Sequence, residues 1–212
     1  MAQTARAKLE QKELKNRVWS GDITQASSFK PAGVERPAAF DACLAAGVFP
    51  HLTEEQEGEA LKNMAGAVRP GGRVFVEFRN ELFALFTLNR YSWEFFTEKL
   101  LPLEAAQPAA ADLKKFFRMD LPAVRPSPAG ADSSIDQILC KFKNPLECPA
   151  FFKTAGLKVE QIHFYHFHAL PPMLEGEHAS VFRAASLEME KDPSDWRGHF
   201  MASAFVVESV RA

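Results

Sequence analysis

The chain has 212 residues, a formal net charge of −2, 47% hydrophobic residues and 25% charged residues. This length allows one domain with its own hydrophobic core, and the composition is that of an ordinary globular protein. A net charge so close to zero gives no electrostatic reason to expect nucleic acid or an anionic membrane as a partner. No apolar run reaches the roughly 20 residues that a membrane-spanning helix needs. Residues 1–15 are polar and charged, unlike a signal peptide, so we expect a cytoplasmic protein.

The cysteines and phenylalanines give no direct sign of catalysis. Cys43 lies inside an apolar run and is expected to be a buried thiol, while Cys140 and Cys148 lack the close spacing of a zinc site. No metal site is therefore expected, and a reducing compartment is the default. The 19 phenylalanines indicate an aromatic-rich core or an apolar substrate pocket, and core packing is the more ordinary use.

The first elements along the chain are expected to be a helix and two strands. Residues 2–15 have the spacing of a surface helix, residues 16–19 begin a short strand, and residues 24–38 form a loop. Residues 39–49 (AFDACLAAGVF) are almost continuously apolar. Such a run is typical of a strand that is buried on both faces, as parallel strands are.

A strand–helix–strand unit follows. Thr53 and Gln56 have the spacing of a capping box, which predicts that a helix begins after Thr53. Pro70-Gly71-Gly72 is expected to end this helix, and residues 73–78 (RVFVEF) form the next strand. A capped helix between two apolar strands predicts a βαβ unit and a parallel sheet.

The second half of the chain is expected to be helical and aromatic before it returns to strands. Residues 81–101 resemble a helix and residues 102–134 are rich in Pro and Ala, so we expect an insertion or cap at 81–134. The last elements are then a helix at 149–155 ended by Gly156, a strand at 157–168, a helix at 179–190 and a strand at 200–210. All of these belong to a single domain spanning residues 1–212.

The ordered set of motifs resembles the class I S-adenosylmethionine-dependent methyltransferases, from the third strand of that family onward. Phe40-Asp41 with His51-Leu52 matches the family's fourth strand, and Arg69 to Val74 (RPGGRV) matches the turn into its fifth. Ser20-Gly21-Asp22-Ile23 and Ala155-Gly156-Leu157 match the segments at the third and sixth strands. The resemblance implies an α/β fold, with a Rossmann-like methyltransferase sheet, flanking helices, no N-terminal strands and a mostly helical insertion after the fifth family strand.

One part of the family pattern has no counterpart in the sequence. The family binds its cofactor on a G-x-G-x-G loop after the first strand, whereas Gly71-Gly72 precedes a strand and is expected to form a turn. Three explanations stay open: an N-terminally truncated sequence, a protein completed by another chain, or a relative that has lost its activity. We expect the unpaired edge of residues 40–49 to be covered by a second copy, a separate N-terminal chain or a displaced strand.

The resemblance also implies which residues bind S-adenosylmethionine. Asp22 would accept a hydrogen bond from the adenine amino group, and Ile23 would cover the adenine face. Ala46, Gly47 and Val48 end a strand at the edge where ligands bind in open α/β sheets, and Gly47 would let the backbone approach the sulfonium. The ordinary alternative for Asp22 is that it caps a turn.

His51 is the candidate general base, because an oxygen acceptor has to lose a proton during methyl transfer. Its alternative role is packing or capping at the helix that begins near Thr53. Arg79, Asn80, Arg90 and Tyr91 are candidates for binding a polar or acidic acceptor, and surface solvation or helix capping is the alternative. His163, His166 and His168 lie on one strand and are expected to be half-exposed side chains rather than metal ligands.

These residues predict a methyltransferase that acts on a small-molecule oxygen or nitrogen acceptor. The alternative is a non-catalytic methyltransferase-like subunit that supports an active partner.

Overall fold

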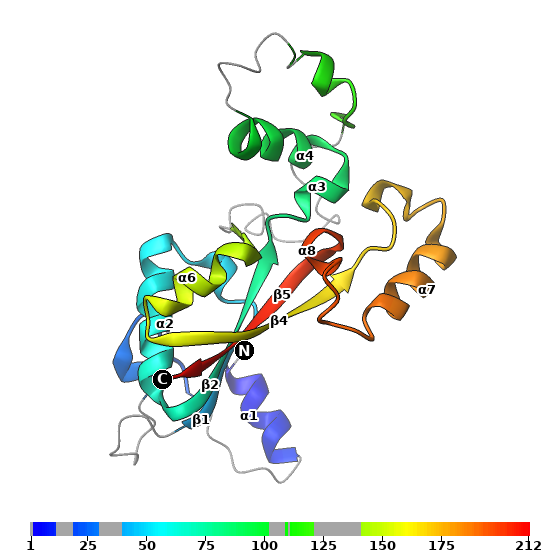
Figure 1. Ribbon diagram of the computed structural model, residues 1–212. Helices are drawn as coiled ribbons and strands as arrows, with labels where there is room; N and C mark the ends of the chain where they lie inside the picture. Colours follow the sequence, from blue (N-terminus) through cyan, green and yellow to red (C-terminus); the bar gives the residue numbers. More distant parts are fainter. Residues whose placement is uncertain (1, 12–18, 30–39, 102–108, 110, 121–140) are drawn as a thin grey trace.

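The computed structural model describes residues 2–11, 19–29, 40–101, 109, 111–120 and 141–212. A twisted sheet runs through the centre of the molecule, and helices cover one of its faces (Figure 1). The strands are β1 (Phe40–Ala45), β2 (Val68–Asn80), β3 (Phe142–Lys143), β4 (Leu157–Phe167) and β5 (Ala202–Arg211). The α-helices named in Figure 1 are α1 (Ala2–Gln11), α2 (Glu54–Ala67), α3 (Ala84–Thr87), α4 (Arg90–Phe95), α6 (Cys148–Lys153), α7 (Ala179–Met189) and α8 (Gly198–Met201).

The strand order in the sheet is β1-β2-β5-β4, with β3 pairing the end of β2. β1 is parallel to β2, whereas β5 is antiparallel to both β2 and β4. β1, β2 and β4 therefore point the same way, and their carboxyl ends lie at the same end of the sheet. The expected mixture of strands and helices, including the parallel β1–α2–β2 unit, is confirmed.

Helix α2 begins where the sequence places it. The Thr53 hydroxyl accepts a hydrogen bond from the Gln56 backbone N–H at 3.3 Å, and the Gln56 side chain accepts one from the Thr53 N–H at 2.9 Å. This reciprocal pair satisfies amide donors that the first turn of a helix cannot satisfy itself. The buried face of the helix, which includes Leu61 and Met64, packs on the sheet.

Phe78 lies at the centre of the core between the sheet and its covering helices. Its ring centroid is 5.4 Å from that of Phe49, 5.6 Å from that of Phe205 and 6.3 Å from that of Phe152. Edge-on and tilted contacts of this kind are the favoured arrangements of aromatic rings. Several of the phenylalanines thus serve the core.

The two faces of β2 differ in character. Val74, Val76 and Phe78 are buried, while Glu77 and Arg79, which alternate with them, are only partly buried. Successive side chains of a strand point to opposite faces, so the polar residues gather on the face away from α2 and α6.

The prediction that residues 39–49 form a strand buried on both faces is wrong. β1 ends at Ala45, and Asp41, Ala42 and Leu44 are exposed, with Leu44 66% exposed. Among the strands that the structure describes, β1 pairs only with β2, so it is an edge strand. Its apolar composition reflects the packing of one face only.

The end of α2 also differs from the expectation. The helix stops at Ala67, and residues 68–72 already belong to β2, where the pairing with β1 is irregular. Gly71 has a positive φ of 72°, and a Cβ on Gly72 would lie 2.8 Å from the Arg69 carbonyl oxygen. The glycine pair therefore forms an irregular start to the strand instead of ending the helix.

The insertion after β2 projects beyond the end of the sheet (Figure 1). Its described part contains α3, α4 and a π-helical segment at Phe96–Leu100 instead of one continuous helix. Leu88 separates α3 from α4 with a left-handed φ of 51°, which breaks the helical path. The expected strand residues 16–18 and much of 102–134 lie outside the described residues. No described helix is long and apolar enough to cross a membrane.

A buried carboxylate fixes the segment that returns from the insertion to the sheet. The Glu57 side chain is 3% exposed and lies 2.7 Å from the Lys143 ammonium and 3.1 Å from that of Lys141. Lys143 also lies over the Phe151 ring, 4.1 Å from its centroid. The Lys141 N–H donates to the Pro50 carbonyl at 2.7 Å, so the same segment is bound to the loop that follows β1.

We expect Glu57→Ala to lower the free energy of unfolding by about 2 kcal/mol, because it leaves two partly buried ammonium groups without their carboxylate. The lysine side chains are 24% and 20% exposed, so water replaces part of the lost interaction. Urea unfolding followed by circular dichroism measures the change. Glu59→Ala, at an exposed position of the same helix, is the control and should change stability much less. Equal stability of the two variants would contradict a structural role for the Glu57 carboxylate.

Candidate functional site

The candidate site lies at the carboxyl ends of β1 and β2, where ligands bind in open α/β sheets. Gly47 comes two residues after β1 and has a left-handed φ of 69°. Its backbone N–H donates to Glu77 Oε2 at 2.7 Å, which joins the turn to β2. A Cβ at Gly47 would meet no atom within 4 Å, so the space in front of this turn is open to a ligand.

Tyr165 of β4 lies on the same sheet face as Glu77. Arg79 and Tyr165 both pair with Ala204 of β5, which lies between them. Burial raises the pKa of Tyr165, the nearby Glu77 carboxylate raises it further, and the positive charge of Arg79 acts in the opposite direction. Tyr165 is therefore a neutral hydroxyl near physiological pH.

His51 follows the Gly47 turn directly. It ends a short 3-10 helix at Phe49–His51, and its backbone N–H donates to the Val48 carbonyl at 3.0 Å. The side chain is exposed, one residue before Leu52 and two before the cap of α2. Ala46, Gly47, Val48 and His51 thus lie on one short segment at the carboxyl end of β1.

The Asp22–Ile23 segment contacts a different part of α2. Asp22 accepts hydrogen bonds from the Thr24 backbone N–H at 2.9 Å and its hydroxyl at 2.8 Å, and these bonds lower the pKa of Asp22. This is the turn-capping geometry that was the alternative for Asp22. The Ile23 carbonyl accepts from the side chain of Asn63, a residue nine positions after Glu54 and therefore about 13 Å further along α2. The segment is thus held toward the far end of α2 from Gly47.

Asn80 has a structural environment. Its side chain is 1% exposed, and its amide nitrogen lies within hydrogen-bonding distance of the carbonyls of Gly198, His199 and Ala202, at 3.2, 2.9 and 2.8 Å. Its oxygen accepts from the Leu82 N–H at 3.0 Å. These partners use the donors of the amide, so Asn80 joins β2 to the α8–β5 connection and we leave it out of the proposed site.

Arg90 and Tyr91 lie on α4, in the insertion and not at the strand ends (Figure 1). The Arg90 guanidinium carbon is 5.1 Å from the Tyr91 ring centroid, and Arg90 Nε is 3.2 Å from Glu94 Oε1. Tyr91 is 43% exposed. The structure therefore does not bring these two residues together with Gly47, Glu77 and Arg79.

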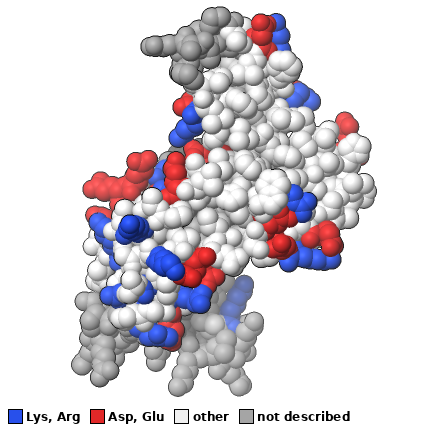
Figure 2. All heavy atoms as spheres, in the orientation of Figure 1, with Lys and Arg blue, Asp and Glu red and all other residues white. Residues whose placement is uncertain are grey.

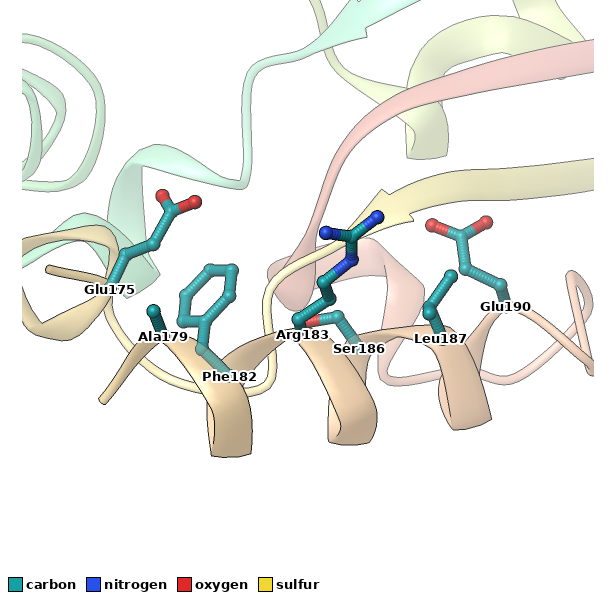
Figure 3. Close-up of a pocket in the computed structure, with 7 residues that line it drawn as sticks. All are labelled: Glu175, Ala179, Phe182, Arg183, Ser186, Leu187 and Glu190. Carbon is teal, nitrogen blue, oxygen red and sulfur yellow. The ribbon is translucent and has the colours of Figure 1, made fainter.

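A pocket along α7 was not predicted from the sequence. It has a volume of about 390 Å³, and Figure 3 shows Arg183 and Glu190 pointing from α7 toward the end of β4. Glu190 Oε1 accepts from the Phe167 N–H at 2.8 Å, and its charge acts on Tyr165. The pocket is lined by Glu175, Ala179, Phe182, Arg183, Ser186, Leu187 and Glu190.

Aromatic contacts connect this pocket to the insertion. The ring of His168 lies 4.7 Å from Phe83 and 5.4 Å from Phe182, measured between centroids. Phe83 precedes α3, and Phe182 is the buried anchor of α7. The prediction that His163, His166 and His168 lie on one strand is wrong for His168, because β4 ends at Phe167, and His166 has a positive φ of 54°.

The remaining reactive groups are dispersed. In the described part of the chain no group of three or more His, Cys, Asp and Glu side chains has a geometry that fits a metal ion. Cys148 is buried, and burial raises the pKa of its thiol to about 12. Figure 2 shows positive and negative side chains interspersed over the visible face.

The environment of Tyr165 predicts a measurable pH dependence. The pKa of Tyr165 is higher in the folded chain than the ordinary value near 10, so folding favours the neutral hydroxyl. This contribution to stability is complete below about pH 10 and is lost as the pH rises, because the unfolded chain ionises first. The chain has two tyrosines, so Tyr91→Phe leaves Tyr165 as the sole source of tyrosinate absorbance.

In Tyr91→Phe we expect tyrosinate absorbance to appear well above pH 10, and the added change Glu77→Gln to move it to lower pH. Far-ultraviolet circular dichroism at each pH distinguishes ionisation from alkaline unfolding. An ordinary tyrosine titration in a chain that remains folded would show that Tyr165 is not held as described.

The comparisons with known proteins give similar structures but no family. No family model matches the chain, and no curated protein matches it. Many similar solved structures are S-adenosylmethionine-dependent methyltransferases. The apo form of the S-adenosylmethionine-dependent methyltransferase SibL is 18% identical, with a TM-score of 0.43. The match covers 99% of this chain and 40% of the SibL chain.

Two further structures are similar over the whole of this chain. The mitomycin 7-O-methyltransferase MmcR is 15% identical with a TM-score of 0.46, and 39% of its own length is covered. The magnesium protoporphyrin IX methyltransferase ChlM from Synechocystis PCC 6803, with bound SAH, is 10% identical with a TM-score of 0.44, and 60% of its length is covered. The chain thus spans about two fifths of the length of the first two structures.

Proposed function

We propose that this chain is an S-adenosylmethionine-dependent methyltransferase that acts on a small-molecule oxygen or nitrogen acceptor. The observation that carries the proposal is the open turn at Gly47, at the carboxyl edge of a sheet built from the strands that the sequence motifs identify. β1, β2, β4 and β5 correspond to the fourth, fifth, sixth and last strands in the family resemblance.

The residues at the carboxyl edge of the sheet suit a methyl donor that approaches the backbone closely. S-adenosylmethionine supplies an activated methyl group on a sulfonium, and the protein has to align it with the acceptor and exclude water. At Gly47 the absence of a side chain and the open space allow close approach, with Ala46 and Val48 on either side. The carboxylate of Glu77 accepts the N–H of the turn.

The part of the proposed site that would bind the methyl acceptor combines polar groups with an apolar lining. Arg79 and the neutral Tyr165 hydroxyl offer hydrogen-bond donors next to Glu77. The α7 pocket is of a size that suits a small molecule, and the side chains of Phe182 and Leu187 give it an apolar lining. His51 is the proposed base, because an imidazole is neutral and able to accept a proton over much of the physiological range.

The second candidate is a non-catalytic methyltransferase-like subunit that supports an active partner. One observation favours it: no two glycines in the sequence are separated by a single residue, so a G-x-G-x-G loop is absent. Such a loop presents several backbone N–H groups to a cofactor. Gly47 and its neighbours alone supply only part of that surface.

Because of this absence, we expect the 212-residue chain to bind S-adenosylmethionine or S-adenosylhomocysteine only weakly, at millimolar concentrations. Isothermal titration calorimetry is the measurement, and micromolar affinity would contradict the expectation. If weak binding is detected, Gly47→Val should abolish it, because a β-branched residue is strained at a φ of 69° and fills the open space. Gly58→Ala, in a helical position with open space around it, is the control and should leave binding unchanged.

In a form that turns over, we expect His51→Ala to lower kcat by about 100-fold while the affinity for the methyl donor changes little, because a base acts on the acceptor's proton. Steady-state kinetics across pH measure both quantities. His178→Ala, an exposed histidine at the start of α7, is the matched control and should retain wild-type kcat. An unchanged rate in His51→Ala at every pH would assign His51 to packing and capping only.

A further inference from the structure

Glu77 connects two segments that are distant in the sequence. It lies on β2, and its Oε2 accepts the Gly47 N–H at 2.7 Å across a separation of 30 residues. The carboxylate thus joins β2 to the turn that follows β1.

The Gly47 turn depends on this carboxylate because the strand pairing ends before it. The last pair between β1 and β2 is Ala45 with Val76, two residues before Gly47. Beyond this pair the backbone of the turn is no longer held by the ladder. A carboxylate that accepts an N–H at 2.7 Å makes a charge-assisted hydrogen bond, which is stronger than one to a neutral acceptor.

The hydrogen bond to Gly47 also fixes the conformation of Glu77. A glutamate side chain on a strand has several rotamers, and the bond to the Gly47 N–H selects one that reaches the end of β1. Glu208 occupies the same sheet face but pairs with Arg73 and His163, so it has a separate role.

We propose that Glu77 is a positioning residue: its carboxylate sets the left-handed turn at Gly47 that faces the methyl donor. The identity of the ligand at this turn rests on the proposed function. The geometry of the turn does not, and the two parts are tested separately.

Amide hydrogen exchange at Gly47, followed residue by residue by NMR, tests the geometry without any ligand. Glu77→Ala should accelerate exchange of the Gly47 amide roughly tenfold or more. Glu77→Gln keeps the shape with a weaker neutral acceptor and should fall between wild type and Glu77→Ala. Glu208→Gln removes a carboxylate from the same sheet face and should leave Gly47 exchange unchanged.

The outcomes separate a local role from general destabilisation. Faster exchange at Gly47, with core amides such as Val76 unchanged, supports the proposal. Wild-type exchange at Gly47 in both Glu77→Ala and Glu77→Gln overturns it, as does an equal acceleration of all amides. If Glu77→Ala does not fold, Glu77→Gln decides, because it keeps the shape of the side chain and removes only its charge.

A second measurement addresses the ligand. Millimolar S-adenosylhomocysteine should shift the Gly47 amide resonance of the wild-type chain, and Glu77→Ala should reduce this shift at least about threefold. If the shift of the Gly47 resonance is identical in wild type and Glu77→Ala, Glu77 does not position the turn for the methyl donor, and that part of the proposal is overturned. Absence of any shift in the wild type, together with the expected exchange pattern, contradicts the proposed function while the role of Glu77 in the turn stands.

Discussion

The pairing of β2 with β5 is the constraint on which the rest of the structure depends. This antiparallel ladder runs from Arg73–Val210 to Arg79–Ala204 and places β5 between β2 and β4. Its alternation sends Val76, Phe78 and Val207 into the core and Glu77 to the opposite face. The apolar face then receives α2 and α6, and the polar face is left for the contacts around Gly47. A shift of register by one residue would exchange these faces.

The two buried or half-buried carboxylates near this ladder have different tasks. Glu57 forms ion pairs with Lys141 and Lys143. These ion pairs hold in place the segment that returns from the insertion to the sheet. Glu77 accepts a hydrogen bond from a neutral donor, the Gly47 N–H. The first arrangement compensates a buried charge with opposite charges, whereas the second uses a charge to fix backbone geometry.

The proposed site is a composite of one predicted segment and several residues that the sequence did not indicate. Residues 46–51 were expected at the edge because a run of apolar residues ends there before a capped helix. Glu77, Tyr165 and Glu190 were missed, although the alternation within residues 73–78 places Glu77 opposite the buried valines. Asn80, which looked like a polar residue after a strand, instead binds backbone carbonyls nearly 120 residues away in the sequence. The two-residue alternation puts Asn80 on the buried face with Val76 and Phe78, but no local pattern gives the carbonyls that it binds.

The sequence by itself determined the features whose causes are local. The capping box at Thr53 and Gln56, the two-residue period of β2 and the left-handed Gly156 after α6 all depend on atoms a few residues apart, and they specify where elements begin and end. Tertiary structure alone decided which strands are neighbours, which face of β1 is exposed and which side chain Glu77 meets. These outcomes depend on contacts between residues 30 to more than 100 positions apart, such as Gly47 with Glu77 and Asn80 with Gly198. No local pattern records them, because the free energy that selects them comes from packing and hydrogen bonding across the assembled sheet.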